Sequence, residues 1–120
     1  MPRPRLRRLR IGPREFMWRA DIRWTRAGVD WQRAVRVRVW GGGKSGQALQ
    51  ADLISVLPPG PWGAGATDMA HPTPADVRAL VEQALASGWR PQLRGGTFLL
   101  SGLATRFSLP GFVLAGRPAD

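Results

Sequence analysis

Two stretches of the chain alternate between apolar and polar residues, and this period of two constrains the fold more than any other feature of the sequence. Residues 16–24 place Phe, Trp, Ala, Ile and Trp at every second position, with Met, Arg, Asp and Arg between them. Residues 33–40 repeat the pattern, with Val35, Val37 and Val39 on the apolar side. Alternation of this kind is typical of a strand with one buried face, and β-branched valines favour strands further. The sequence therefore predicts two half-buried strands.

Residues 48–57 fit two patterns. Leu49 and Leu53 suit one face of a strand, and together with Ile54 they also suit one face of a helix. We favour a strand because the glycine-rich loop before this stretch can close a hairpin with residues 33–40. A helix remains the alternative.

The main helix is predicted at about 74–87. Thr73 is a favourable N-cap, Pro74 suits the first helical position, and Asp76 places a carboxylate near free backbone N–H groups. One apolar face then follows at helical spacing, formed by Val77, Leu80, Val81, Ala84 and Leu85. Gly88 is the expected terminator of this helix.

Further short strands are predicted at 97–101, 103–109 and 112–115. With the earlier strands and the helix they predict a single α+β domain over residues 15–116. Its antiparallel sheet should have four to six strands, with the main helix packed on one face.

The net charge is +10 at pH 7, and much of it lies at the N-terminus. Residues 1–14 are predicted to be a basic flexible tail, because prolines oppose a helix and the arginines repel one another. Leu9–Ile11 are an alternative start for the first strand. Residues 117–120 are predicted to be a C-terminal tail.

The absence of cysteine excludes disulfides, thiolate metal sites and a cysteine nucleophile. The longest apolar runs are far shorter than the roughly 20 residues of a membrane helix, and the N-terminus lacks a secretory pattern. We therefore expect a cytoplasmic protein with no membrane partner. No cofactor is predicted.

Capping and packing residues follow one another through residues 73–100, as Thr73-Pro74, Val77, Ala84-Leu85, Gly88-Trp89, Pro91, Gly96, Phe98 and Leu100. This segment resembles one found in small, uncharacterised bacterial proteins, where it joins a capped helix to a strand. The resemblance implies a helix–turn–strand unit here. It implies no activity and no site residue.

The glycine-rich loop 41–46 contains Lys44 and is similar to a phosphate-binding loop. A Walker A motif needs a glycine five residues before Gly43, but that position is Arg38, and the favoured strand follows where the motif requires a helix. A flexible hairpin turn is therefore the preferred interpretation. Contact between Lys44 and a phosphate remains an alternative.

His71 is the only histidine, and Asp68 lies close enough in sequence to form an acid–base pair with it. The sequence supplies neither a third group to orient the pair nor an evident nucleophile. The acidic residues also form no close carboxylate pair, and a structural zinc site of the usual ligands cannot be assembled. No catalytic or metal-binding residue is predicted.

Arg19 and Arg23 lie on the polar side of the first alternating stretch, and Arg36 and Arg38 lie on that of the second, with Trp40 beside them. If the two strands pair, these arginines share one sheet face. Guanidinium groups bind phosphates in bidentate fashion, and an exposed tryptophan can stack on a base. The alternative is a solvated face whose arginine stems cover apolar surface.

The leading hypothesis is a non-enzymatic binding module that engages the RNA or DNA backbone through the basic tail and this arginine-bearing face. The second hypothesis is a protein-interaction adaptor or inhibitor that uses Trp62 in the long loop 58–72. A small enzyme with Asp68 and His71 is the third. The residues assigned to nucleic-acid contact are Arg3, Arg5, Arg7, Arg8, Arg10, Arg19, Arg23, Arg36, Arg38, Trp40 and Lys44.

Overall fold

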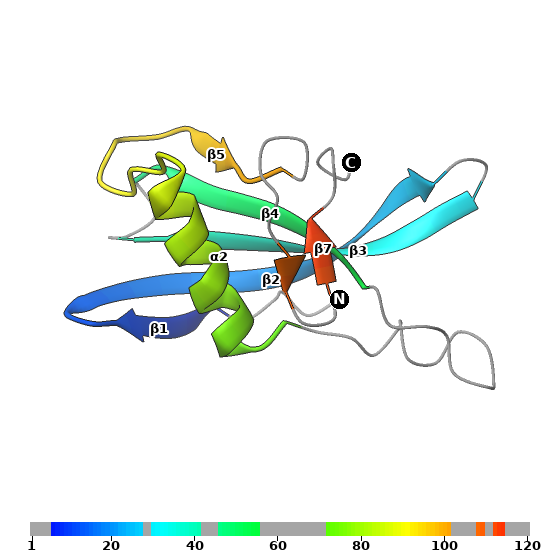
Figure 1. The fold of residues 1–120 in the computed structure, drawn as a ribbon. Coiled ribbons are helices and arrows are strands. Elements are labelled where there is room, and N and C mark those ends of the chain that lie inside the picture. The colour runs from blue at the N-terminus through cyan, green and yellow to red at the C-terminus, as the bar shows by residue number, and fades with distance from the viewer. Residues whose placement is uncertain are drawn as a thin grey trace.

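The computed structural model describes residues 6–27, 30–41, 46–55, 72–101, 108–109 and 112–114. Within these ranges the chain forms one helix and one sheet of mostly antiparallel strands, which is the α+β class that the sequence predicts (Figure 1). In chain order the elements are β1 (Arg7–Ile11), β2 (Arg14–Ala27), β3 (Asp30–Trp40), β4 (Ala48–Ser55), α2 (Pro74–Ala86), β5 (Thr97–Leu99), β6 (Ser108–Leu109) and β7 (Phe112–Leu114).

The two alternating stretches form the long hairpin at the centre of the sheet. β2 and β3 pair antiparallel from Met17 opposite Trp40 to Ala27 opposite Asp30. Phe16 and Trp18 are buried on one side of β2, and the valines of β3 are buried in the same way. The predicted period of two is therefore confirmed for the valines of β3 and for the start of β2, whereas Ile22, predicted on the apolar side, is 49% exposed.

The ambiguous stretch is a strand over residues 48–55, and residues 56–57 lie outside the described ranges. β4 pairs antiparallel with β3, and its Leu49, Ala51 and Leu53 are buried. The strand interpretation is therefore confirmed for the described part. A helix is excluded there because the backbone groups of these residues are used in pairing with β3.

The sheet has the strand order β1-β2-β3-β4-β7-β6, with β5 pairing parallel to β4. β5 lies along the start of β4, and β7 lies along its end, so the two short strands share one edge of β4. Over the described residues the sheet has seven strands, against the four to six expected, and three of them are only two or three residues long.

Residues 7–11 form a strand, which differs from the prediction of a flexible tail over residues 1–14. β1 pairs antiparallel with β2, and Leu9 and Ile11 pack against the core. Gly12 turns the chain between the two strands with a φ of 58°, a conformation that glycine adopts at little cost. The sequence of this segment does not reveal the strand, because its many arginines are also typical of a solvated tail. The strand is stabilised by pairing with β2, which no pattern within residues 7–11 indicates. Residues 1–5, with Arg3 and Arg5, lie outside the described ranges.

The helix α2 begins at the predicted cap. The Asp76 N–H donates to Thr73 Oγ1 at 3.2 Å, and the Thr73 N–H donates to Asp76 Oδ2 at 2.9 Å, so the two residues form a reciprocal capping box. At the other end, the Trp89 N–H donates to the Ala84 carbonyl at 2.9 Å while Gly88 has a φ of 111°. This is the Schellman arrangement, and it explains why the helix ends at Ala86.

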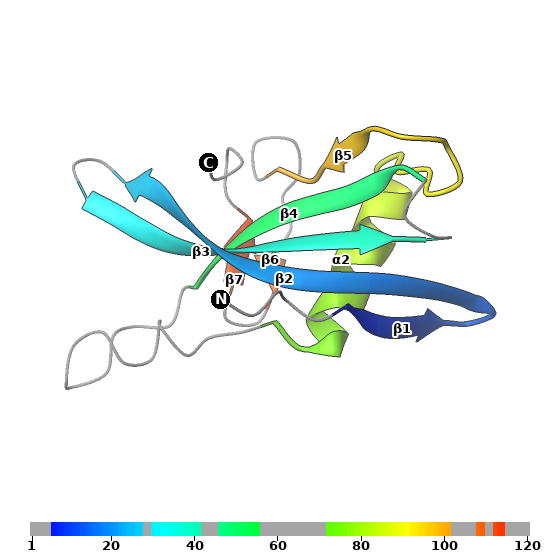
Figure 2. The same ribbon diagram turned by 180° about the vertical axis from the view of Figure 1, so that it is seen from behind.

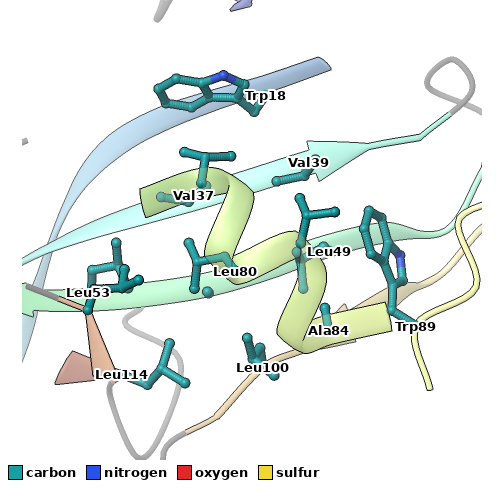
Figure 3. Close-up of a cluster of buried hydrophobic side chains, with 14 of the residues drawn as sticks. Trp18, Val37, Val39, Leu49, Leu53, Leu80, Ala84, Trp89, Leu100 and Leu114 are labelled. Atoms are coloured by element: carbon teal, nitrogen blue, oxygen red, sulfur yellow. The ribbon is translucent and has the colours of Figure 1, made fainter. Parts of the chain in front are cut away.

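One hydrophobic cluster joins the helix to the strands (Figure 3). It contains Leu80 and Ala84 from α2 together with Trp18, Val39 and Leu49 from three strands. Figures 1 and 2 give opposite views of this arrangement, with the helix in front of the strands in Figure 1 and behind them in Figure 2.

Replacing Thr73 with alanine should lower the free energy of unfolding by about 1 kcal/mol, because the variant loses the hydroxyl that accepts from the Asp76 N–H. Urea denaturation followed by circular dichroism measures this change. Thr73→Ser is the matched control, since it keeps the hydroxyl and should stay close to wild type. Equal losses in both variants would show that the hydroxyl at position 73 does not contribute to the free energy of unfolding.

Candidate functional site

The strand register places the predicted arginines on one face of the sheet. Arg19 lies opposite Arg38, and Arg36 lies opposite Asp21, across the β2–β3 ladder. Residues directly opposite each other in an antiparallel pair project to the same face. We call this surface the arginine face, defined by Arg19, Arg23, Arg36 and Arg38. It is the reverse of the face that carries the buried side chains of Trp18, Val37 and Val39.

Arg36 on this face is held by Asp52 of the neighbouring strand β4. The register sets the two residues opposite each other. The Arg36 Nε donates to Asp52 Oδ1 at 2.9 Å, and its Nη2 donates to Asp52 Oδ2 at 3.3 Å. The side chains are 16% and 2% exposed, so this is a largely buried bidentate ion pair. The guanidinium of Arg36 is therefore committed to a partner within the fold.

Arg19 is less fully compensated. Its Nε lies 3.5 Å from Asp21 Oδ2, which is close enough for an ion pair. The same Nε is buried and forms no hydrogen bond in the part of the chain that the structure describes. The attraction to Asp21 is thus electrostatic, without the alignment of a hydrogen bond.

Arg38 is less compensated than Arg19 and Arg36. Its Nη2 donates to Thr97 Oγ1 at a long 3.4 Å, and its Nε is buried without a hydrogen bond among the described residues. Burial lowers the pKa of Arg38, the positive charges of Arg19 and Arg36 lower it further, and Asp21 acts in the opposite direction. No described carboxylate forms an ion pair with this guanidinium.

Trp40 does not provide the exposed stacking surface expected from the sequence. The side chain is only 7% exposed. The guanidinium carbons of Arg19 and Arg38 lie 5.7 Å and 5.5 Å from its ring centroid, which is within the range of cation–π contact. The arginines that were expected to flank the indole lie against its ring instead, and a base cannot stack there in this conformation.

The remaining predicted arginines divide between the two faces. Arg8 and Arg10 lie opposite Met17 and Glu15 and belong to the same side of the sheet as the arginine face. Arg7 lies on the other side, with its guanidinium carbon 5.6 Å from the centroid of the Trp18 ring. The structure therefore places Arg7 on the opposite side of the sheet from Arg8, Arg10 and the arginine face.

Several predicted site residues lie outside the described ranges, so the structure neither joins them to the arginine face nor separates them from it. They are Arg3, Arg5, Lys44, Trp62, Asp68 and His71.

Asp52 and Thr97 are the contributors to this site that sequence reasoning missed. Once residues 48–55 are known to form a strand, Asp52 falls on the side opposite Leu49 and Leu53, which is a usable signal. Thr97 has no comparable signal, because its strand meets β4 from a distant part of the chain.

No family model, curated protein or solved structure matches this chain. Among the described residues, no cluster of three or more His, Cys, Asp or Glu side chains could hold a metal ion. In the same ranges, no helix is long and apolar enough to cross a membrane.

Proposed function

We propose that the protein is a non-enzymatic binding module that holds RNA or DNA on its arginine face by contacts to the phosphate backbone. The observation that supports this most directly is Arg38. It is a partly buried cation beside two other arginines, and it has no carboxylate partner in the described structure. A phosphate group would supply the missing negative charge and accept hydrogen bonds from the guanidinium.

The proposal includes the position of the helix. The buried residues of α2 share a cluster with Trp18 and Val39, which alternate along their strands with Arg19 and Arg38. We therefore propose that α2 covers the face opposite the arginines. A long anion could then lie across the strands without meeting the helix, which Figure 2 shows behind the sheet.

The expected mode of binding has little sequence preference. Contacts to phosphate carry no base information, and Trp40 is covered by two arginines. The net charge of +10 would add long-range attraction to any nucleic acid. The cytoplasm, predicted from the sequence, is a compartment where such a ligand is available.

Binding of a labelled duplex oligonucleotide at increasing salt tests this function. The logarithm of the association constant should fall linearly with the logarithm of salt concentration, with a slope of about −0.9 for each phosphate contacted. In the variant Arg19→Gln/Arg23→Gln, the slope should become less negative by about 1.8, because two contacts are lost.

The matched control is Arg78→Gln/Arg90→Gln, which removes the same charge from exposed residues of α2 and the turn after it. It should keep the wild-type slope. Absence of duplex binding at low salt would refute the proposed function, and equal slope changes in both double variants would refute the assignment to the arginine face.

A further inference from the structure

We propose that Arg19 and Arg38 together form a subsite for a single phosphate group. The ion pair of Arg36 with Asp52 lies on the same sheet face and stays intact when the phosphate binds. This inference rests on the proposed function and adds to it a specific location and stoichiometry. The ligand chemistry is a phosphate oxyanion, either a diester in a nucleic-acid backbone or a free phosphate ion.

Arg36 and Arg38 have different partners although they are two residues apart on the same strand face. Two donors of Arg36 point at the carboxylate of Asp52, at 2.9 Å and 3.3 Å. Within the described structure, the hydrogen bond of Arg38 reaches the neutral hydroxyl of Thr97, at 3.4 Å. Arg36 is thus a positioning residue that contributes a fixed positive charge, while Arg38 has donors suited to an external acceptor.

Arg19 is placed to share the same ligand. It lies directly opposite Arg38 across the β2–β3 ladder, and both guanidinium groups lie against the ring of Trp40. Like charges placed opposite each other on a sheet repel, and the single carboxylate of Asp21, which lies 3.5 Å from the Nε of Arg19, offsets this repulsion only in part. The negative face of the indole partly offsets the repulsion and keeps both cations close together.

Each of the two side chains also has an unsatisfied donor. The Nε atoms of Arg19 and Arg38 are buried and form no hydrogen bonds within the described structure. Buried polar groups without partners are rare in folded proteins and call for an explanation. The lowered pKa of Arg38, caused by burial and by the neighbouring arginines, agrees with a cation that lacks its counter-charge. An anion that draws the two guanidinium groups toward it would relieve both features.

Phosphate suits this pair better than a carboxylate does. A carboxylate matches the fork of one guanidinium, as Asp52 does for Arg36. Two guanidinium groups from adjacent strands present more donors than one carboxylate can accept. A phosphate diester shares one negative charge between two non-bridging oxygens in a tetrahedral group, so each arginine can donate to its own oxygen, and an inorganic phosphate offers more acceptor oxygens and more charge.

The test is titration of inorganic phosphate into the full chain, followed by the Nε–Hε signals of the arginines in a ¹⁵N-correlated spectrum. Addition of phosphate should shift the signals of Arg19 and Arg38, while sodium chloride at equal ionic strength should leave them in place. Arg38→Gln should abolish the shift at Arg19. In duplex binding, it should make the salt slope less negative by about 0.9, which is the loss of one contact.

Arg78→Gln is the matched control, since this arginine lies on α2 and pairs with Glu82 at 3.7 Å. It should keep the phosphate response and the salt slope.

Thermal unfolding gives a second measurement of phosphate binding. Phosphate should raise the unfolding temperature of the wild type and leave that of Arg38→Gln unchanged.

The outcomes distinguish the subsite from the proposed function. If the duplex binds equally well to Arg38→Gln and to wild type, with the same salt slope, the subsite is refuted and the function stands. If phosphate shifts the Arg19 and Arg38 signals but no oligonucleotide binds at low salt, the subsite is supported for free phosphate and the function is refuted.

Discussion

Replacing Arg36 with leucine is expected to lower the free energy of unfolding by about 3–5 kcal/mol. The substitution removes the bidentate partner of Asp52, whose side chain is 2% exposed. Burial of a carboxylate costs desolvation free energy, and the attraction to the guanidinium of Arg36 offsets this cost. Without Arg36 the desolvation cost remains and the attraction is lost. Urea denaturation at neutral pH, followed by circular dichroism, measures the change.

The double variant Arg36→Leu/Asp52→Leu is the informative control. Replacing both members of a buried ion pair with apolar residues is often neutral or stabilising, so the double variant should recover most of the loss. The coupling free energy from the four proteins of the cycle then isolates the pair. A single variant as stable as wild type would show that the pair does not hold β3 and β4 together.

Replacing Trp89 with alanine should destabilise the protein by about 3–5 kcal/mol. Trp89 is 2% exposed, its ring centroid lies 6.0 Å from that of Phe16, and its Nε1 donates to the Gln47 carbonyl at 3.0 Å. The substitution therefore opens a cavity at the end of α2 and also releases the segment that leads into β4. The urea midpoint measures this loss of stability.

Trp89→Phe separates the two contributions. Phenylalanine keeps an aromatic ring against Phe16 but cannot donate to the Gln47 carbonyl. We expect it to lose markedly less stability than the alanine variant, since a single hydrogen bond contributes about 1 kcal/mol. If the two variants were equally destabilised, the hydrogen bond rather than the packing would be the main contribution of Trp89.

The elements that the sequence predicts well are those specified by neighbouring residues. The alternation in β2 and β3 predicts the burial of Phe16, Trp18 and the valines of β3, because alternate residues of a strand point to opposite faces. The start of α2 is equally local, since Thr73 and Asp76 cap the helix through bonds three residues apart.

The candidate site could be predicted only in part. Period-two patterning is enough to assign Arg19 and Arg38 to the polar sides of their strands. The pairing of Arg36 with Asp52 depends on the register between β3 and β4, and the contact of Arg38 with Thr97 depends on a parallel strand that follows the helix. No local sequence pattern predicts either of these two contacts.

Trp40 is a residue whose exposure the sequence pattern predicts wrongly. Its position on the polar side of β3 predicts exposure, yet the side chain is 7% exposed, with arginines from two strands against its ring. One of these arginines, Arg19, comes from the other strand of the hairpin. Burial of this kind follows from cross-strand neighbours, which only the register reveals.

The sequence by itself therefore determined the strand character of the hairpin, the capped helix and the polar side on which the arginines lie. These features depend on backbone geometry and on neighbours a few residues away. The tertiary structure decided which arginines are compensated, by setting Asp52 opposite Arg36 and leaving Arg38 opposite Arg19. Electrostatic compensation depends on distances between side chains far apart in the sequence, and the pairing of strands sets those distances.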